Sequence, residues 1–186
     1  MKRFFDIAVS IIFFLVFSFP MLFIALAIIL TSKGPIIYWS NRVGQNNHIF
    51  KMPKFRTMRL DTPDLPTHLM KNPMHYISPL GSFLRKYSLD ELPQLISIFL
   101  GDMSFVGPRP ALFNQDDLIS LRKEKNLDIL KPGLTGWAQI NGRDNLSIKE
   151  KVSLDLEYMN NQSFLLDLKI FWLTFLKVVK SNNISH

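Results

Sequence analysis

The 186-residue chain contains no cysteine and only four histidines, which excludes several kinds of active site. Without cysteine there is no disulfide, no cysteine-ligated zinc and no thiol nucleophile. The histidines, at positions 48, 68, 75 and 186, show no metal-ligand spacing. Also missing are the glycine-rich nucleotide motifs, HExxH, GxSxG and the DxD of many nucleotide-sugar glycosyltransferases. The nearest approach to DxD, "DLE" at residues 155–157, is assigned to an ordinary helix face.

The excess of positive charge lies entirely in the first 60 residues. The chain has 22 basic and 15 acidic residues, a formal net charge of +7. Eight of the basic residues but only one acidic residue, Asp6, precede residue 61, so the rest of the chain is neutral. The same segment holds the most apolar run. This arrangement favours anionic phospholipids over nucleic acid as the partner of the basic residues.

Residues 7–30 form an apolar run without a charged residue. As a straight helix it would be roughly 36 Å long, enough to cross the ~30 Å hydrocarbon layer. Pro20, near its middle, removes a backbone donor and disturbs the preceding turn. Basic residues flank both ends, and basic flanks tend to stay cytoplasmic. We therefore predict a re-entrant helix–break–helix hairpin over residues 1–33, with a proline-kinked transmembrane helix or a signal peptide as alternatives.

The remaining residues, 34–186, read as one globular domain that is mainly α-helical. Two segments rich in β-branched and aromatic residues, 36–40 and 48–58, flank a Gly/Asn-containing loop and predict a short β-hairpin. Residues 61–79 carry four prolines and predict a surface loop. Further helices are expected at 80–88, 111–126, 147–161 and 164–180. The last of these is either a buried helix or an amphipathic helix in the membrane interface.

Two adjacent carboxylates, Asp90 and Glu91, precede Pro93, and Arg109 stands between two prolines further on. One interpretation is a helix start with Asp90 as N-cap and Pro93 at the third helical position. A chemical interpretation is also open. Paired carboxylates suit Mg²⁺ together with substrate phosphates, and a carboxylate also serves as a nucleophile. A fixed arginine grips phosphate, so the three residues suit a phosphoryl-transfer site.

Six segments along the chain resemble the bacterial sugar transferase family, the small monotopic phosphoglycosyl transferases that begin glycan assembly on a polyprenyl phosphate. The segments follow the family's order and cover nearly the whole chain. They are "KRFFDI", "KFRTM", "LRKYSLDELPQL", "GDMSFVGPRP", "KPGLTGWAQINGR" and "SFLLDLKI". The nearest look-alikes are the short initiating enzymes of bacterial protein N-glycosylation.

The resemblance implies transfer of a phospho-sugar from a UDP-sugar to undecaprenyl phosphate, giving a sugar-diphosphate-undecaprenol and UMP. It implies that Asp90 is the nucleophile of a covalent aspartyl intermediate, with Glu91 as its partner and both as Mg²⁺ ligands. Arg109 and Arg85 would bind phosphate. The substrate-binding residues expected from it are Lys54, Arg56, Gln139, Asn141 and Arg143.

Family members often carry a Ser-Pro pair at the membrane bend, whereas here Phe19 precedes Pro20 and Ser18 stands one place earlier. The resemblance implies a protein of the bacterial cytoplasmic membrane, with its globular part on the cytoplasmic face. A non-catalytic membrane-anchored scaffold or binding module is the alternative. The sequence leaves open the sugar, the pathway (exopolysaccharide, capsule, O-antigen or protein glycosylation) and whether the protein forms a homodimer.

Overall fold

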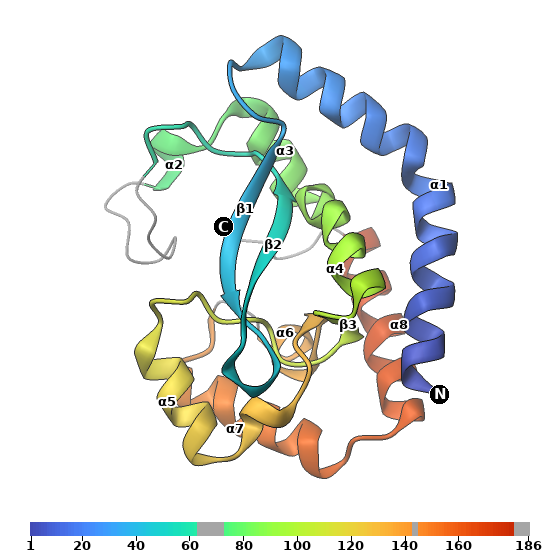
Figure 1. Ribbon diagram of the computed structural model, residues 1–186, viewed down its shortest axis with the longest axis vertical. Helices are drawn as coiled ribbons and strands as arrows, with labels where there is room; N and C mark the ends of the chain where they lie inside the picture. Colours follow the sequence, from blue (N-terminus) through green and yellow to red (C-terminus); the bar gives the residue numbers. More distant parts are fainter. Residues whose placement is uncertain (63–72, 143–144, 181–186) are drawn as a thin grey trace.

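The computed structural model describes residues 1–62, 73–142 and 145–180. Figure 1 shows a long first helix, α1, along one side of a body in which a β-hairpin is surrounded by shorter helices. The predicted mainly helical fold with one small antiparallel hairpin is confirmed. Part of the loop expected over residues 61–79 lies outside the described residues, and α2 (Pro73–Tyr76) is a short helix within that range.

Helix α1 (Lys2–Thr31) is continuous and contains Pro20, so no non-helical residue separates its two halves. Its axis nevertheless changes direction near the middle (Figure 1). Pro20 offers no N–H to the preceding turn, and the Ser18 hydroxyl donates to the Leu15 carbonyl at 2.9 Å. Within the described ranges, α1 is the one helix long and apolar enough to cross a membrane by length and composition.

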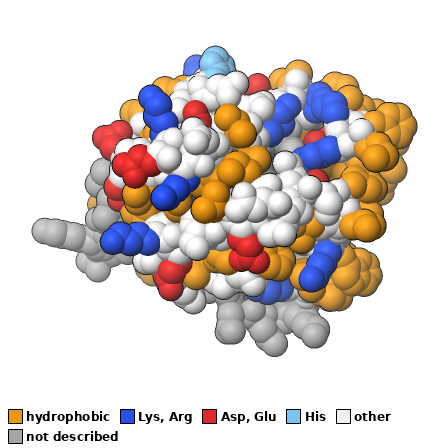
Figure 2. Space-filling model, turned by 90° about the horizontal axis from the view of Figure 1, so that it is seen from below, with side chains coloured by type: hydrophobic (Ala, Val, Ile, Leu, Met, Phe, Trp, Pro, Cys, Tyr) orange, Lys and Arg blue, Asp and Glu red, His pale blue; other side chains and the backbone are white. Residues whose placement is uncertain are grey.

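Both ends of α1 are fastened to the same globular body. The Arg3 guanidinium donates to the carbonyls of Ile98 and Phe99, each at 2.6 Å. At the other end Arg56 Nη2 donates to the Ser32 carbonyl at 3.1 Å, just beyond the last helical residue. Between these attachments α1 exposes apolar side chains, among them Leu15, Val16, Phe19 and Phe23. Figure 2 shows hydrophobic side chains gathered along the edge on which α1 lies in Figure 1.

Strands β1 (Ile37–Val43) and β2 (Ile49–Phe55) pair antiparallel, with Ile37 opposite Phe55 and Val43 opposite Ile49. A 3₁₀ turn, Gln45–Asn47, connects them. The burial of β2 alternates at first, so that Phe50 and Met52 point into the core while Lys51 is exposed. The hairpin therefore carries core residues on one face and leaves Lys54 near its end for the site described below.

The remaining elements surround the hairpin (Figure 1), and all but the last two helices have fewer than ten residues. The helix expected over 111–126 is confirmed only for its central part, because residues 111–115 are not helical. In chain order the elements are α3 (Pro79–Lys86), η3 (Leu89–Gln94), α4 (Leu95–Leu100), β3 (Ser104–Val106), α5 (Asp116–Glu124), η4 (Leu127–Ile129), β4 (Gly133–Thr135), α6 (Trp137–Ile140), α7 (Ile148–Asn160) and α8 (Phe164–Lys180).

Strands β3 and β4 pair in parallel, a contact that no sequence pattern predicts. Their loops approach backbone to backbone at glycines. A Cβ on Gly107 would lie 2.2 Å from the Lys131 carbonyl, and one on Gly136 would lie 2.1 Å from the Gly107 carbonyl. Neither contact is compatible with a side chain at these positions. The glycines therefore bring the "VGPRP" segment against the "KPGLTGW" segment.

The main core combines β2, α4, β3 and α8 around Phe105, which is 1% exposed. Phe5 and Phe13 of α1 pack on Phe105 edge to face, with ring centroids 6.3 and 5.7 Å apart. Helix α8 buries Ile170 in this core, while its opposite face exposes Leu165, Trp172 and Phe175. The first half of α1 is therefore part of the domain core, and α8 keeps one apolar face uncovered.

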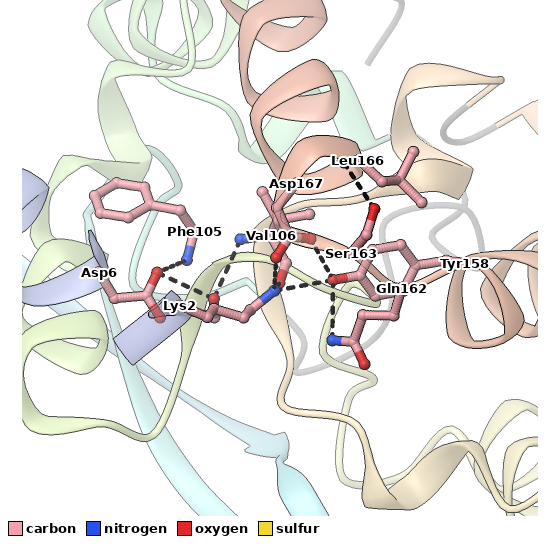
Figure 3. Close-up of polar contacts among 10 residues, drawn as sticks. Lys2, Asp6, Phe105, Val106, Tyr158, Gln162, Ser163, Leu166 and Asp167 are labelled. Atoms are coloured by element: carbon pink, nitrogen blue, oxygen red, sulfur yellow. Dashed lines mark hydrogen bonds and ion pairs between the residues drawn. The ribbon is translucent and has the colours of Figure 1, made fainter. Parts of the chain in front are cut away.

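A largely buried polar network joins the start of α1 to the start of α8 (Figure 3). Lys2 Nζ donates to Asp167 Oδ2 at 2.7 Å, to the Tyr158 hydroxyl at 2.9 Å and to the Val106 carbonyl at 2.8 Å. Asp6 accepts bonds from the Ser104 hydroxyl and the Phe105 amide, both at 3.1 Å. The "KRFFDI" and "SFLLDLKI" segments thus meet in space, which fixes the start of α1 on the body.

Candidate active site

The carboxylate pair lies in the 3₁₀ helix η3, and the expected helix start is wrong by two residues. Ser88, not Asp90, is the N-cap, and Asp90 is the second residue of η3. Ser88 adopts a left-handed conformation with φ of 55°, which turns the chain earlier than the sequence pattern suggested. Pro93 lies in the 3₁₀ segment before α4 begins at Leu95, so its missing N–H breaks no α-helical bond.

Glu91 receives two cations on one oxygen. Its Oε1 atom lies 2.7 Å from Lys54 Nζ and 3.1 Å from Arg109 Nη2. The Glu91 and Lys54 side chains are only 11% and 15% exposed. The structure thereby brings together three residues predicted separately: Lys54 from the end of β2, Glu91 from η3 and Arg109 from the loop after β3. A charge-assisted pair of this length, partly shielded from water, holds both side chains in a fixed orientation.

Asp90 is buried beside this ion pair, at 6% exposure. Burial raises the pKa of Asp90 above its ordinary value and the negative charge of Glu91 adds to the rise, while Lys54, Arg85 and Arg109 oppose it. In the part of the chain described, the Asp90 carboxylate accepts no hydrogen bond. A carboxylate that is buried among cations is suited to attack an electrophile once it is ionised.

Arg85 completes the ring of cations. Its Nε atom donates to the Thr57 hydroxyl at 3.0 Å, which directs the guanidinium from α3 toward the end of β2. Burial lowers the pKa of Arg85, while Asp90 and Glu91 raise it. Burial likewise lowers the pKa of Lys54, against the opposing effect of Glu91. Thr57, which orients Arg85, was not singled out in the sequence, although it belongs to the "KFRTM" segment.

The other predicted substrate-binding residues lie in contacts of their own. Arg56 binds Ser32 through Nη2, and its buried Nη1 atom has no hydrogen-bond partner among the described residues. The Gln139 amide nitrogen donates to the Leu134 carbonyl at 3.0 Å. The Asn141 amide nitrogen donates to the Trp137 carbonyl at 2.8 Å. Arg143 lies outside the described residues.

The side chains at this site that could hold a metal ion are the two adjacent carboxylates, Asp90 and Glu91. No group of three or more His, Asp or Glu side chains gathers at one place within residues 1–62, 73–142 and 145–180. Mg²⁺ commonly uses one or two protein carboxylates and completes its shell with water and substrate phosphate. Asp90 and Glu91 therefore fit Mg²⁺ chemically, with substrate phosphate supplying the oxygens that the protein does not.

The geometry and the charges of this arrangement define a class of site. Two buried carboxylates with three cationic side chains around them suit the transfer of a phosphorus-bearing group between anionic substrates. The family model described as "Bacterial sugar transferase" matches residues 1–181. The chain belongs to this family, as its motifs predicted.

Curated relatives match almost the whole chain. An uncharacterized sugar transferase, EpsL, of Bacillus subtilis is 39% identical over 184 residues, 99% of this chain and 90% of that protein. The exopolysaccharide production protein ExoY of Sinorhizobium fredii is 37% identical over 190 residues, 93% of this chain and 83% of that protein. A UDP-glucose:undecaprenyl-phosphate glucose-1-phosphate transferase of Escherichia coli is 40% identical over 185 residues, 95% of this chain but only 40% of that protein.

Proposed function

We propose that this protein transfers a phospho-sugar from a UDP-sugar to undecaprenyl phosphate, releasing UMP, as the first membrane step in assembling a glycoconjugate. The observation that carries the proposal is the buried Asp90 carboxylate beside Glu91, with Lys54, Arg85 and Arg109 around the pair. The name of the Escherichia coli relative supports both substrates, UDP-glucose and undecaprenyl phosphate. The name of the Sinorhizobium relative supports a role in exopolysaccharide production.

The reaction proceeds in two displacements at one phosphorus atom. An Asp90 carboxylate oxygen attacks the phosphorus that bears the sugar, and the bond from that phosphorus to the UMP oxygen breaks, so that UMP leaves. A phosphate oxygen of undecaprenyl phosphate then attacks the same phosphorus. The Asp90 oxygen–phosphorus bond breaks, which restores the carboxylate and yields the sugar-diphosphate-undecaprenol. Each step exchanges one phosphorus–oxygen bond for another.

The cations have separable roles in this scheme. Arg109 and Arg85 bind the phosphate oxygens. They thereby offset the repulsion between the negatively charged carboxylate and the negatively charged diphosphate. Lys54 fixes Glu91, which assists the incoming lipid phosphate. A Mg²⁺ ion held by Asp90 and Glu91 would supply further positive charge to the diphosphate. Gln139, Asn141 and Arg143 remain candidates for contacts with the nucleotide-sugar, and Arg56 for a contact with the lipid phosphate.

We further propose that α1 enters the membrane and returns to the same face, so that the protein is monotopic and the body rests on the cytoplasmic side. Two observations support this topology. Arg3 and Ser32 lie at opposite ends of α1, yet hydrogen bonds attach both of them to the same globular body. The apolar residues exposed by α8, including Trp172 and Phe175, suit a helix at the lipid interface.

The function is tested by incubating the purified protein with undecaprenyl phosphate and a panel of UDP-sugars while measuring UMP. One or more UDP-sugars should release UMP, and Asp90→Asn should abolish the release because an amide is not a nucleophile. Asp61→Asn is the matched control, since Asp61 is exposed and pairs only with Arg59 among the described residues. If Asp90→Asn released UMP at the wild-type rate, Asp90 would not be the nucleophile, whereas a non-catalytic scaffold would release no UMP even as the wild type.

A further inference from the structure

The Pro108-Arg109-Pro110 segment is held through its carbonyl groups by three different elements. Because neither proline has an N–H, the three carbonyl groups make up most of the polar backbone groups of this segment. The Pro108 carbonyl accepts a bond from the Gly133 amide of β4 at 2.9 Å. The Arg109 carbonyl accepts from Arg122 Nη1 of α5 at 2.9 Å, and the Pro110 carbonyl accepts from Arg42 Nη1 of β1 at 3.2 Å.

Arg122 is itself oriented by a buried acid. Its Nε and Nη2 atoms donate to Asp155 Oδ2 of α7 at 3.1 and 2.7 Å. The Asp155 and Arg122 side chains are 2% and 13% exposed. One planar guanidinium thus bridges a buried carboxylate on α7 and the main chain of the residue that binds Glu91. Asp155 lies in the "DLE" stretch, whose sequence predicts only an ordinary helix face.

A pair of this kind is a poor source of stability. Removing two charges from water is expensive, and apolar replacements of buried ion pairs are often neutral or stabilising. Burial accordingly raises the pKa of Asp155, against the opposing effect of Arg122. What the pair does provide is geometry, because the guanidinium plane fixes the direction of all its N–H groups. Here that direction is toward the Arg109 carbonyl.

We propose that Arg122, oriented by Asp155, is a positioning residue that sets the place of Arg109 for binding the diphosphate of the sugar donor. The inference rests on the proposed function and adds two residues to it that touch neither substrate nor reacting atoms. Lysine at position 122 does not replace arginine in this role, because a single ammonium on a flexible stem lacks the planar fork that spans both partners.

The test is a cycle of variants assayed for UMP release and for thermal unfolding. Arg122→Leu with Asp155→Leu removes both charges together, so no unpaired charge remains buried and the melting temperature should stay within about 3 °C of wild type. Arg122→Lys is the conservative variant. Arg59→Gln is the matched control, since Arg59 also bonds an aspartate through Nε and Nη2 but is 55% exposed.

In the wild-type background the Leu/Leu pair should lower kcat/KM about 10- to 100-fold, the loss expected when a binding group is misplaced by roughly 1 Å. In the Arg122→Lys variant kcat/KM should also stay below the wild-type value, whereas Arg59→Gln should leave kcat/KM unchanged. In an Arg109→Gln background the Leu/Leu pair should cause less than about a twofold further loss, because the group that it positions is already gone.

The inference would be overturned by an unchanged kcat/KM in the Leu/Leu variant, or by the same fold-loss in both backgrounds, which would indicate a general structural defect. A failure of the proposed function looks different. In that case the wild type would release no UMP from any UDP-sugar, and the inference would fall with it. If the wild type releases UMP and Arg109→Gln does so at the same rate, Arg109 does not bind the phosphate. The proposed positioning of Arg109 by Arg122 is then refuted as well.

Discussion

Replacing Lys54 by methionine probes the balance of charge around the carboxylate pair. Lys54 Nζ lies 2.7 Å from Glu91 Oε1, and Lys54 is the cation that most strongly opposes the rise in the pKa of Asp90. Methionine keeps the stem and removes the charge. Two carboxylates would then share one buried site with less positive charge nearby, so the pKa of Asp90 should rise further.

The expected loss of stability follows from the remaining partners of Glu91. Removing one member of a fully buried pair costs roughly 3–5 kcal/mol. Here Arg109 continues to bond Glu91, so we expect roughly 2–3 kcal/mol. For a chain of this size that corresponds to a fall in melting temperature of roughly 5–10 °C. Lys51→Met, on the same strand but exposed, is the control and should change neither quantity.

The pH dependence of kcat/KM gives the sharper readout. An attacking carboxylate must be ionised, so the rate falls as the pH drops through the pKa of Asp90, which burial already holds above the ordinary range. Lys54→Met should move this acidic fall in kcat/KM to higher pH and lower the rate most at acidic pH. If the fall stayed at the same pH, or moved to lower pH, Lys54 would not be the cation that opposes the rise in the pKa of Asp90.

Three further outcomes are expected. Gly107→Ala should lower the free energy of unfolding by roughly 1–3 kcal/mol, because its Cβ would lie 2.2 Å from the Lys131 carbonyl. It should also lower kcat/KM by more than the fraction of unfolded protein accounts for, and wild-type values in both assays would contradict the described backbone contact. Cysteines introduced by Phe4→Cys and Asn41→Cys should react with an impermeant thiol reagent from the same side of the membrane, whereas reaction from opposite sides would mean that α1 crosses it. Chelation by EDTA should stop UMP release and added Mg²⁺ should restore it, and full activity in EDTA would remove Mg²⁺ from the proposal.

Local patterns were sufficient to predict the elements whose residues contact near neighbours in sequence. The β-branched and aromatic segments around the Gly/Asn loop predicted the hairpin that β1 and β2 form. Helix α8 follows the expected range, Phe164–Lys180. Asp90, Glu91 and Arg109 were predicted from motifs, and the structure places them around one centre because η3 and the loop after β3 both pack near the end of β2.

Features that depend on distant segments were not predictable from spacing. The three-residue strands β3 and β4 are too short for a pattern, and their pairing depends on backbone contacts at Gly107 and Gly133. The start of η3 depends on the left-handed conformation of Ser88, which no residue type dictates there. Asp155 looked like an ordinary helix-face residue, because its partner, Arg122, lies on another helix and in turn bonds a main-chain carbonyl outside both helices.

The covalent intermediate is tested most directly by mass spectrometry. The protein is mixed with a UDP-sugar that it uses as a substrate, in the absence of undecaprenyl phosphate. The intact mass should increase by one phospho-sugar, a peptide containing Asp90 should carry the addition, and undecaprenyl phosphate should discharge it. An enzyme that releases UMP only when the lipid is present, with no adduct on Asp90 at any time, would instead transfer the group directly between its substrates, contrary to the covalent route.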